Sequence, residues 1–170
     1  YTNSTSSTIH DSLGESHVLT YYFVKDAPGS LTNSGVNPDP NQWQMFTYLD
    51  GVPRDIQGGT SITHPNTDPT TGTTTNTSQL SAQFNFNPDG SLAATFPVNL
   101  QNVSINLPNG SEPLVLTHDF LNNNTTQFSA AFSVNSLNPT GYATGRLTGI
   151  DISEEGLVRA SYTNGISTPM

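Results

Sequence analysis

The sequence contains no cysteine among its 170 residues, and it contains only four cationic side chains, Lys25, Arg54, Arg146 and Arg159. The missing cysteines exclude disulfides, thiolate catalysis and zinc sites built on cysteine. The four cations stand against 13 acids, so the net charge is −9. Binding to nucleic acid requires several phosphates to be neutralised together, and an anionic membrane surface also attracts basic segments. We therefore expect neither nucleic acid nor a membrane as a partner.

Long apolar runs are also missing, because no stretch approaches the roughly 18 residues that a membrane-spanning helix needs. The first 14 residues have neither the basic nor the apolar region of a secretory signal. The chain begins with tyrosine rather than methionine, so we expect a processed form or an internal piece of a longer protein. The acidic, lysine-poor composition favours an extracellular location.

Small polar residues are abundant: 24 Thr, 19 Ser and 18 Asn make up 61 of the 170 residues. Their side chains compete with the helical backbone for hydrogen bonds, and 14 Gly and 12 Pro interrupt any remaining helix. The composition therefore predicts an all-β fold, an antiparallel β-barrel or sandwich of about nine strands with long polar loops. The nine short runs that favour strands are His17–Val24, Gln42–Leu49, Gln79–Phe86, Ser91–Val98, Val103–Leu107, Leu114–His118, Gln127–Val134, Gly145–Ile152 and Leu157–Thr163.

Three turns connect neighbouring runs. Residues 87–90, Asn-Pro-Asp-Gly, combine a proline with an Asp-Gly pair that can adopt left-handed backbone angles. Residues 154–156, Glu-Glu-Gly, are expected to do the same between the last two runs. Residues 11–14, Asp-Ser-Leu-Gly, are expected to turn residues 6–10 into the run that begins at His17.

The alternation of apolar and polar residues indicates which faces are buried. In Gln127–Val134, apolar side chains occupy every second position, which predicts a strand with one face on a core. Leu157–Tyr162 alternates in the same way, whereas Gln42–Leu49 carries apolar residues on both faces and is expected to be covered on both sides. Two polar stretches are expected to be surface loops: Gly58–Ser78, with nine threonines, and the shorter Ala27–Pro40.

Catalytic patterns are not apparent. The nucleophile motif Gly-x-Ser-x-Gly does not occur. In the adjacent pairs His10-Asp11 and His118-Asp119, neighbours on a strand point to opposite faces, so we interpret both histidines as surface or strand-end residues. The acids occupy no recognisable glycosidase setting. We assign no catalytic residue and no cofactor-binding residue.

Two patterns resemble metal sites without reaching the required ligand set. Residues 85–90 imitate the start of a calcium loop, but the first position is Asn, and Phe96 stands where the bidentate Glu belongs. We interpret them as a hairpin turn. His10 and His17 flank a tight turn and could face each other across the hairpin, but no third ligand is clustered with them. We therefore assign no metal ligand.

The ends of the chain carry a resemblance to a known family. Thr8–Asp26 (TIHDSLGESHVLTYYFVKD) and Asn41–Gly51 (NQWQMFTYLDG) contain Asp-Ser-x-Gly, a following His, Tyr-Phe-x-Lys and a nearby Trp. Gly141–Gly165 contains Gly-Tyr-x-x-Gly-x-Leu, an acidic-Gly turn and Tyr-x-Asn-Gly, and Phe84–Leu92 contains a Phe-Asn turn. In this order and spacing the segments resemble the outer β-domain of the bacterial flagellar hook protein family. His10 departs from the family, which usually has Tyr or Phe there, and the Thr-rich stretch resembles nothing in it.

The resemblance implies a non-enzymatic structural subunit of the hook, the curved tube that acts as a universal joint between motor and filament. It implies other hook subunits as partners and export to the flagellum without a cleaved signal peptide, in an unfolded state that disulfides would obstruct. The family's terminal helices are missing here, so we expect the isolated chain to be a monomer. Residues 1–140 are expected to form the outer domain. Residues 141–170 are expected to form a returning hairpin, in the same domain or at the start of the adjacent inner one.

A second hypothesis remains open, an extracellular carbohydrate-binding or adhesin-type β-sandwich module. It requires a platform of exposed aromatic side chains, for which the candidates are Tyr21, Trp43, Tyr48 and Tyr142. Each lies within an alternating run, so we expect all four in the core.

Overall fold

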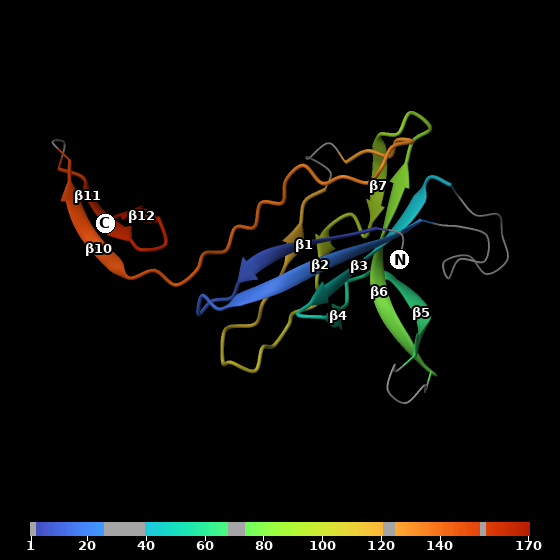
Figure 1. Cartoon of the computed structure of the whole chain (residues 1–170), viewed down its shortest axis with the longest axis horizontal. Helices are drawn as coiled ribbons and strands as arrows, with labels where there is room; N and C mark the ends of the chain where they lie inside the picture. Colours follow the sequence, from blue (N-terminus) through green and yellow to red (C-terminus); the bar gives the residue numbers. More distant parts are fainter. Residues whose placement is uncertain (1–2, 26–39, 68–73, 121–124, 154–155) are drawn as a thin grey trace.

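The structure, a computed structural model, describes residues 3–25, 40–67, 74–120, 125–153 and 156–170 (Figure 1). Within these ranges the chain forms strands and no helix, and so none of the described residues belongs to a helix that could cross a membrane. The predicted all-β class is confirmed. The strands are β1 (Asn3–His10), β2 (Ser16–Lys25), β3 (Gln42–Leu49), β4 (Val52–Arg54), β5 (Thr60–Thr67), β6 (Thr74–Phe86), β7 (Leu92–Phe96), β8 (Leu100–Gln101), β9 (Thr117–His118), β10 (Leu147–Ile152), β11 (Val158–Tyr162) and β12 (Ser167–Pro169).

A seven-stranded antiparallel sheet forms the body of the molecule. Its strands follow the order β1-β2-β3-β6-β5, and β4 pairs with β3 while β7 pairs with β6. The path ends at β1 and at β5, so the sheet is not closed into a barrel. Strands β8 and β9 form a small ladder of their own, with Leu100 opposite His118.

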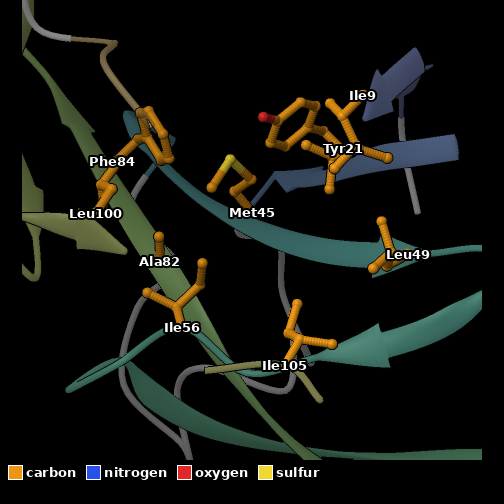
Figure 2. Packing of buried hydrophobic residues seen from close by; sticks show 10 residues of the cluster. Ile9, Tyr21, Met45, Leu49, Ile56, Ala82, Phe84, Leu100 and Ile105 are labelled. Carbon is orange, nitrogen blue, oxygen red and sulfur yellow. The ribbon is translucent and has the colours of Figure 1, made fainter. Parts of the chain in front are cut away.

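The core lies on one face of this sheet. Met45 and Leu49 of β3 are fully buried, and they pack with Phe84 of β6 and with Ile105, which comes from the segment after β8 (Figure 2). Burying a side chain of this size stabilises the fold by about 1.5–3 kcal/mol. On the opposite face of β3, Gln44 and Phe46 are buried as well. The prediction that this strand is covered on both sides is confirmed.

Two of the predicted turns are formed as expected. Gly14 donates its N–H to the carbonyl of Asp11 at 3.0 Å, and Gly90 donates to the carbonyl of Asn87 at 2.9 Å. Gly90 has φ of +85°, which glycine adopts without steric cost. Residues 154–155 lie outside the described residues, but the Gly156 N–H reaches the carbonyl of Ser153 at 2.9 Å, and β10 pairs with β11.

The predicted Thr-rich loop at residues 58–78 is wrong for most of its length. Strands β5 and β6 pair in register from Thr60 opposite Ser81 to Thr67 opposite Thr74. Threonine is β-branched and favours the extended backbone, so a threonine-rich segment can form a hairpin with little apolar content. At its base, Ile62 and Gln79 are buried. Residues 68–73 and most of the second expected loop, 27–39, lie outside the described residues.

The predicted strand Gln127–Val134 is also wrong. These residues form no strand, and Phe128, Phe132 and Val134 are exposed to 67%, 42% and 41%. Two-residue alternation marks a strand only when a partner offers backbone hydrogen bonds, and here the ladder is limited to a single bridge between Ser91 and Thr126. Likewise, the expected strands Val103–Leu107 and Leu114–His118 shrink to a bridge between Ile105 and Leu114 and to the two residues of β9.

A second, three-stranded sheet forms at the C-terminus from β10, β11 and β12. Figure 1 shows it at the end of the extended segment that follows the main sheet, apart from the strands of that sheet. This segment contacts the β1–β2 turn, where Thr144 Oγ1 donates to the carbonyl of Leu13 at 2.8 Å. The last two predicted runs are thereby confirmed as strands, whereas β4 and β12 were not predicted.

Candidate functional site

A buried polar network joins β2, β3, β9 and the residue after β8. Asn102 Nδ2 donates to Thr47 Oγ1 at 2.7 Å, and His118 Nε2 lies 2.7 Å from Asn102 Oδ1. On its other side, His118 Nδ1 lies 2.9 Å from the Tyr21 hydroxyl. Burial lowers the pKa of His118 to about 4 and raises the pKa of Tyr21 to about 12.

The groups of this network are buried and paired within the protein. His118 and Asn102 are exposed to only 8% and 1%, and both ring nitrogens of His118 are engaged within the protein. His118 is the last residue of β9, as the expected strand-end position requires, but it is not a surface residue because its ring fills the space between Tyr21 and Asn102. The adjacent Asp119 is exposed and lies on the other side of the strand end.

A second polar cluster surrounds the turn between β1 and β2. Asp11 Oδ1 accepts hydrogen bonds from the backbone N–H groups of Leu13 and Glu15, and Asn109 Nδ2 donates to Asp11 Oδ2 and to Glu15 Oε2. Burial by itself would raise the pKa of Asp11, but the hydrogen bonds from Asn109 and from the two backbone groups, together with the nearby His17 ring, lower it to about 2. The Asp11 carboxyl is therefore ionised at neutral pH.

His17 lies at the centre of this cluster. Its Nδ1 is 2.7 Å from Asp50 Oδ2, and its Nε2 is 3.6 Å from Asp11 Oδ2. The hydrogen bond to Asp50 raises the pKa of His17 against the opposing effect of burial, and Asp11 adds to the rise. Asp50 is held in place by accepting the backbone N–H of Val18 at 2.8 Å.

The two-histidine pair considered from the sequence is not formed. In the β1–β2 register, Ile9 stands opposite His17 and His10 stands opposite Ser16. Residues that face each other across a ladder share a side of the sheet, so His10 and His17 point to opposite sides. The group of potential ligands that the structure brings together is instead Asp11, Glu15 and His17.

The calcium-like pattern at residues 85–90 is a hairpin turn, as predicted. Asp89 Oδ1 accepts hydrogen bonds from the Ser91 backbone N–H at 2.9 Å and from the Ser91 hydroxyl at 2.6 Å. These bonds lower the pKa of Asp89. The carboxylate thus stabilises the turn between β6 and β7.

The four candidate aromatic residues form no common platform. Tyr21 is buried, Trp43 and Tyr48 are half-buried, and Tyr142 is 65% exposed, so the expectation of a core position was wrong for Tyr142. The Trp43 indole N–H donates to Gln127 Oε1 at 2.6 Å, and Tyr48 packs edge-on against Tyr22 at 5.0 Å. The sugar-stacking surface that a carbohydrate-binding module needs is not assembled from these residues.

A groove of about 990 Å³ lies between β1, β2 and residues of the ranges 114–120 and 125–141. Its aromatic lining includes Phe23, Phe84 and Phe120, which pack edge-on against one another with ring centroids 5.2–6.4 Å apart. These rings pack against one another, and the groove brings no group of charged side chains together. The groove is therefore the partly filled edge of the core.

The C-terminal sheet has one apolar face. Its ladder pairs Leu147 with Tyr162, Ile150 with Ala160 and Ile152 with Val158, and directly paired residues lie on the same side. Ile150 and Ile152 are exposed to 58% and 66%. The opposite face carries Asp151, Arg159 and Ser161. An apolar sheet face of this kind is typical of an interaction surface.

Sequence reasoning missed Asp50 and Glu15 as neighbours of His17, and Asn109 as the residue that bridges Asp11 and Glu15. Asp50 is 33 residues away in the chain and Asn109 contacts Asp11 across 98 residues, so no local pattern relates them. The available signal was the Asp-Ser-Leu-Gly turn itself, because a short loop places Asp11 beside the start of β2 and hence beside His17.

Comparisons with known proteins identify relatives of the chain. The family model described as the flagellar basal body protein FlaE D2 domain matches residues 1–142. The flagellar hook proteins FlgE of Escherichia coli K12 and of Salmonella typhimurium LT2 are each 27% identical over 164 residues, which is 96% of this chain and 32% of each relative. The crystal structure of Helicobacter pylori flagellar hook protein FlgE2 covers 98% of this chain and 31% of that chain, with a TM-score of 0.47 and 18% identity. The chain thus spans about a third of the length of the curated relatives it matches.

Proposed function

Since the chain belongs to the family of the flagellar basal body protein FlaE D2 domain, we propose that it is a structural domain of a flagellar hook subunit. The observation that carries this proposal is the family match over residues 1–142 of 170. In this role the chain has no enzymatic activity, and its partners are further copies of the hook subunit. It contributes contacts on the outer surface of the curved tube that joins motor to filament.

The composition of the surface supports the proposed role. Subunits of a rotating joint must slide against one another, so their outer contacts should be polar, hydrated and individually weak. Only 10% of the residues are charged, while Thr, Ser and Asn are abundant. Such a surface offers many hydrogen-bonding groups but few long charged side chains that would fix one arrangement.

The proposed location is the extracellular part of the flagellum, reached without a cleaved signal peptide. Export as an unfolded chain through a narrow channel would be obstructed by disulfides, and the sequence has no cysteine. The proposal includes neither a nucleic acid nor a membrane as partner, in keeping with the net charge of −9.

Within the hook subunit, we assign residues 1–140 to the outer domain and residues 141–170 to the start of the adjacent domain. Two observations support this division. The family match ends at residue 142, and the apolar face of β10 and β11 is exposed in this chain. An apolar face of a small sheet is stabilised by packing on another layer, which the remaining two thirds of the longer protein could supply.

The proposal is tested by labelling living cells of the source bacterium. A single cysteine is introduced into the parent gene at Asn106, whose side chain is exposed, and cells are treated with a membrane-impermeant fluorescent maleimide. This chain contributes no cysteine of its own, so relative to cells with the unmodified gene we expect one additional fluorescent spot at the base of each filament. The matched control is Ser81→Cys, a nearly isosteric change at a fully buried position, which should remain unlabelled. Label spread over the cell body, or reaching Asn106→Cys only after lysis, would contradict the proposed role.

A further inference from the structure

His17 has a ring nitrogen with no hydrogen-bond partner. The residue is only 8% exposed, and its Nε2 atom is buried without a donor or acceptor at hydrogen-bond distance. The nearest acid, Asp11 Oδ2, is 3.6 Å away, which is beyond a hydrogen bond. Leaving a buried polar atom without a hydrogen bond destabilises the folded chain, so the Nε2 atom points to a ligand that would satisfy it.

The hydrogen bond to Asp50 sets the orientation of the His17 ring. Nδ1 lies 2.7 Å from Asp50 Oδ2 and donates its proton to that carboxylate, so in the neutral ring the lone pair of Nε2 is directed toward Asp11 and Glu15. Asp50 in turn accepts the Val18 N–H. A carboxylate that holds the far nitrogen of a histidine is the arrangement that orients metal-ligating histidines in proteins.

We propose that Asp11, Glu15 and His17 form a binding site for a divalent metal ion, with Zn²⁺ as the ion that fits best. One ligand atom from each of the three residues lies within 4.8 Å of the others. Bonds of about 2.0–2.1 Å to a tetrahedral zinc ion place neighbouring ligand atoms about 3.3 Å apart, close to the 3.6 Å between His17 Nε2 and Asp11 Oδ2. Small side-chain adjustments therefore suffice.

The chemistry of the three ligands selects the ion. Imidazole nitrogen favours Zn²⁺ over Mg²⁺ and Ca²⁺, and the two carboxylates balance its double charge while His17 remains neutral. Asn109 Nδ2, which donates to both Asp11 Oδ2 and Glu15 Oε2, stabilises the two carboxylates by hydrogen bonds when no ion is bound. Zinc binding should displace this amide group and fix the β1–β2 turn through the ion.

The test is titration of the 170-residue chain with Zn²⁺ alone, after treatment with a chelator, followed by calorimetry. We expect one ion per chain and a rise in melting temperature that the chelator reverses.

Glu15→Gln removes an exposed ligand without disturbing the core, and it should weaken binding at least tenfold. Asp50→Asn should weaken binding equally, through the orientation of His17. His17→Gln should abolish binding, with circular dichroism to verify the fold. His10→Gln is the matched control, because His10 points to the other side of the sheet, and should bind as the unmodified chain does.

Asn109→Asp provides a test in the opposite direction. It replaces the amide beside the two carboxylates by a third acid, so it should tighten Zn²⁺ binding by at least tenfold and lower the stability of the metal-free chain. The proposal is overturned if the unmodified chain binds no Zn²⁺ at micromolar concentration. It is equally overturned if Glu15→Gln and Asn109→Asp both leave the affinity unchanged.

Discussion

His118 is held in one tautomer by its two neighbours. Asn102 uses its amide nitrogen to donate to Thr47 Oγ1 and to the carbonyl of Asp55, so its oxygen faces His118 Nε2. Nε2 must therefore carry the proton, and Nδ1 accepts the hydrogen bond from the Tyr21 hydroxyl. A second proton on His118 would meet the Tyr21 hydroxyl oxygen without a charge to balance it, in a site that excludes water.

This arrangement predicts a loss of stability in mild acid. The pKa of His118 is 6.5 in a model compound and about 4 in the folded chain because of burial. Below pH 6.5 the unfolded chain takes up a proton that the folded chain does not, so the free energy of unfolding should fall by about 3 kcal/mol between pH 6.5 and pH 4. Below pH 4 both states are protonated and this contribution stays constant.

Urea denaturation at several pH values measures the effect. Carboxylates also titrate in this range, so the informative quantity is the difference between the unmodified chain and His118→Gln. The variant is expected to be less stable at pH 7 and to show a shallower decline toward pH 4. Parallel curves for the two proteins would show that the pKa of His118 is the same in the folded and unfolded chains, which contradicts the prediction.

At the scale of elements, the turn between β6 and β7 also anchors a distant segment. A Cβ atom on Gly90 would lie 2.4 Å from the carbonyl oxygen of Gln127, and Gln127 donates its backbone N–H to the Gly90 carbonyl at 2.8 Å. The glycine is thus needed for its positive φ and for the close approach of residues 125–127.

Gly90→Ala and Gly110→Ala separate these two requirements. Both glycines have positive φ, but a Cβ on Gly110 would meet nothing within 4 Å. Gly110→Ala should cost about 1–2 kcal/mol from the left-handed backbone alone. Gly90→Ala should cost more by about 1–3 kcal/mol, because the backbone of Gln127 must move. If urea denaturation gives equal losses of unfolding free energy for the two variants, residues 125–127 can move away from position 90 at no cost.

The elements also show how far the sequence predicts the fold. Strand β3 was predicted with its observed bounds because its run of apolar residues coincides with the residues that pair with the neighbouring strands. Strand β5 and the first part of β6, residues 60–67 and 74–78, were missed because the prediction relied on apolar content, whereas threonine stabilises strands through its branched Cβ. Gln127–Val134 has a strand's alternation but no partner strand among the residues that the structure describes, and partners that are distant in sequence are not visible in one segment.

The candidate site, too, could be predicted from the sequence only in part. The turn at residues 11–14 was predicted from Asp, Ser and Gly, and it places Asp11 beside His17. The contributions of Asp50 and Asn109 depend on the pairing of β2 with β3 and on the position of residues 105–114 against the core, so they required the structure.

For the whole molecule, the association state tests the division at residue 141. We expect the isolated chain to sediment as a monomer at micromolar concentration, because its outer surface is polar and the apolar face of β10 and β11 is small. A chain ending at residue 142 should behave identically. If the full chain dimerises and the shortened chain does not, the apolar face pairs with a second copy rather than with an adjacent domain.

One tryptophan, Trp43, connects β3 to the segment leading toward the C-terminal sheet through its hydrogen bond to Gln127. The indole is half-buried, and Lys25 Nζ lies 5.7 Å from its ring. Since the chain has no other indole, the fluorescence spectrum comes largely from this junction. The molecule therefore carries an intrinsic optical probe, whose emission should shift to longer wavelength when residues 125–127 detach from the sheet while the core around Phe84 stays folded.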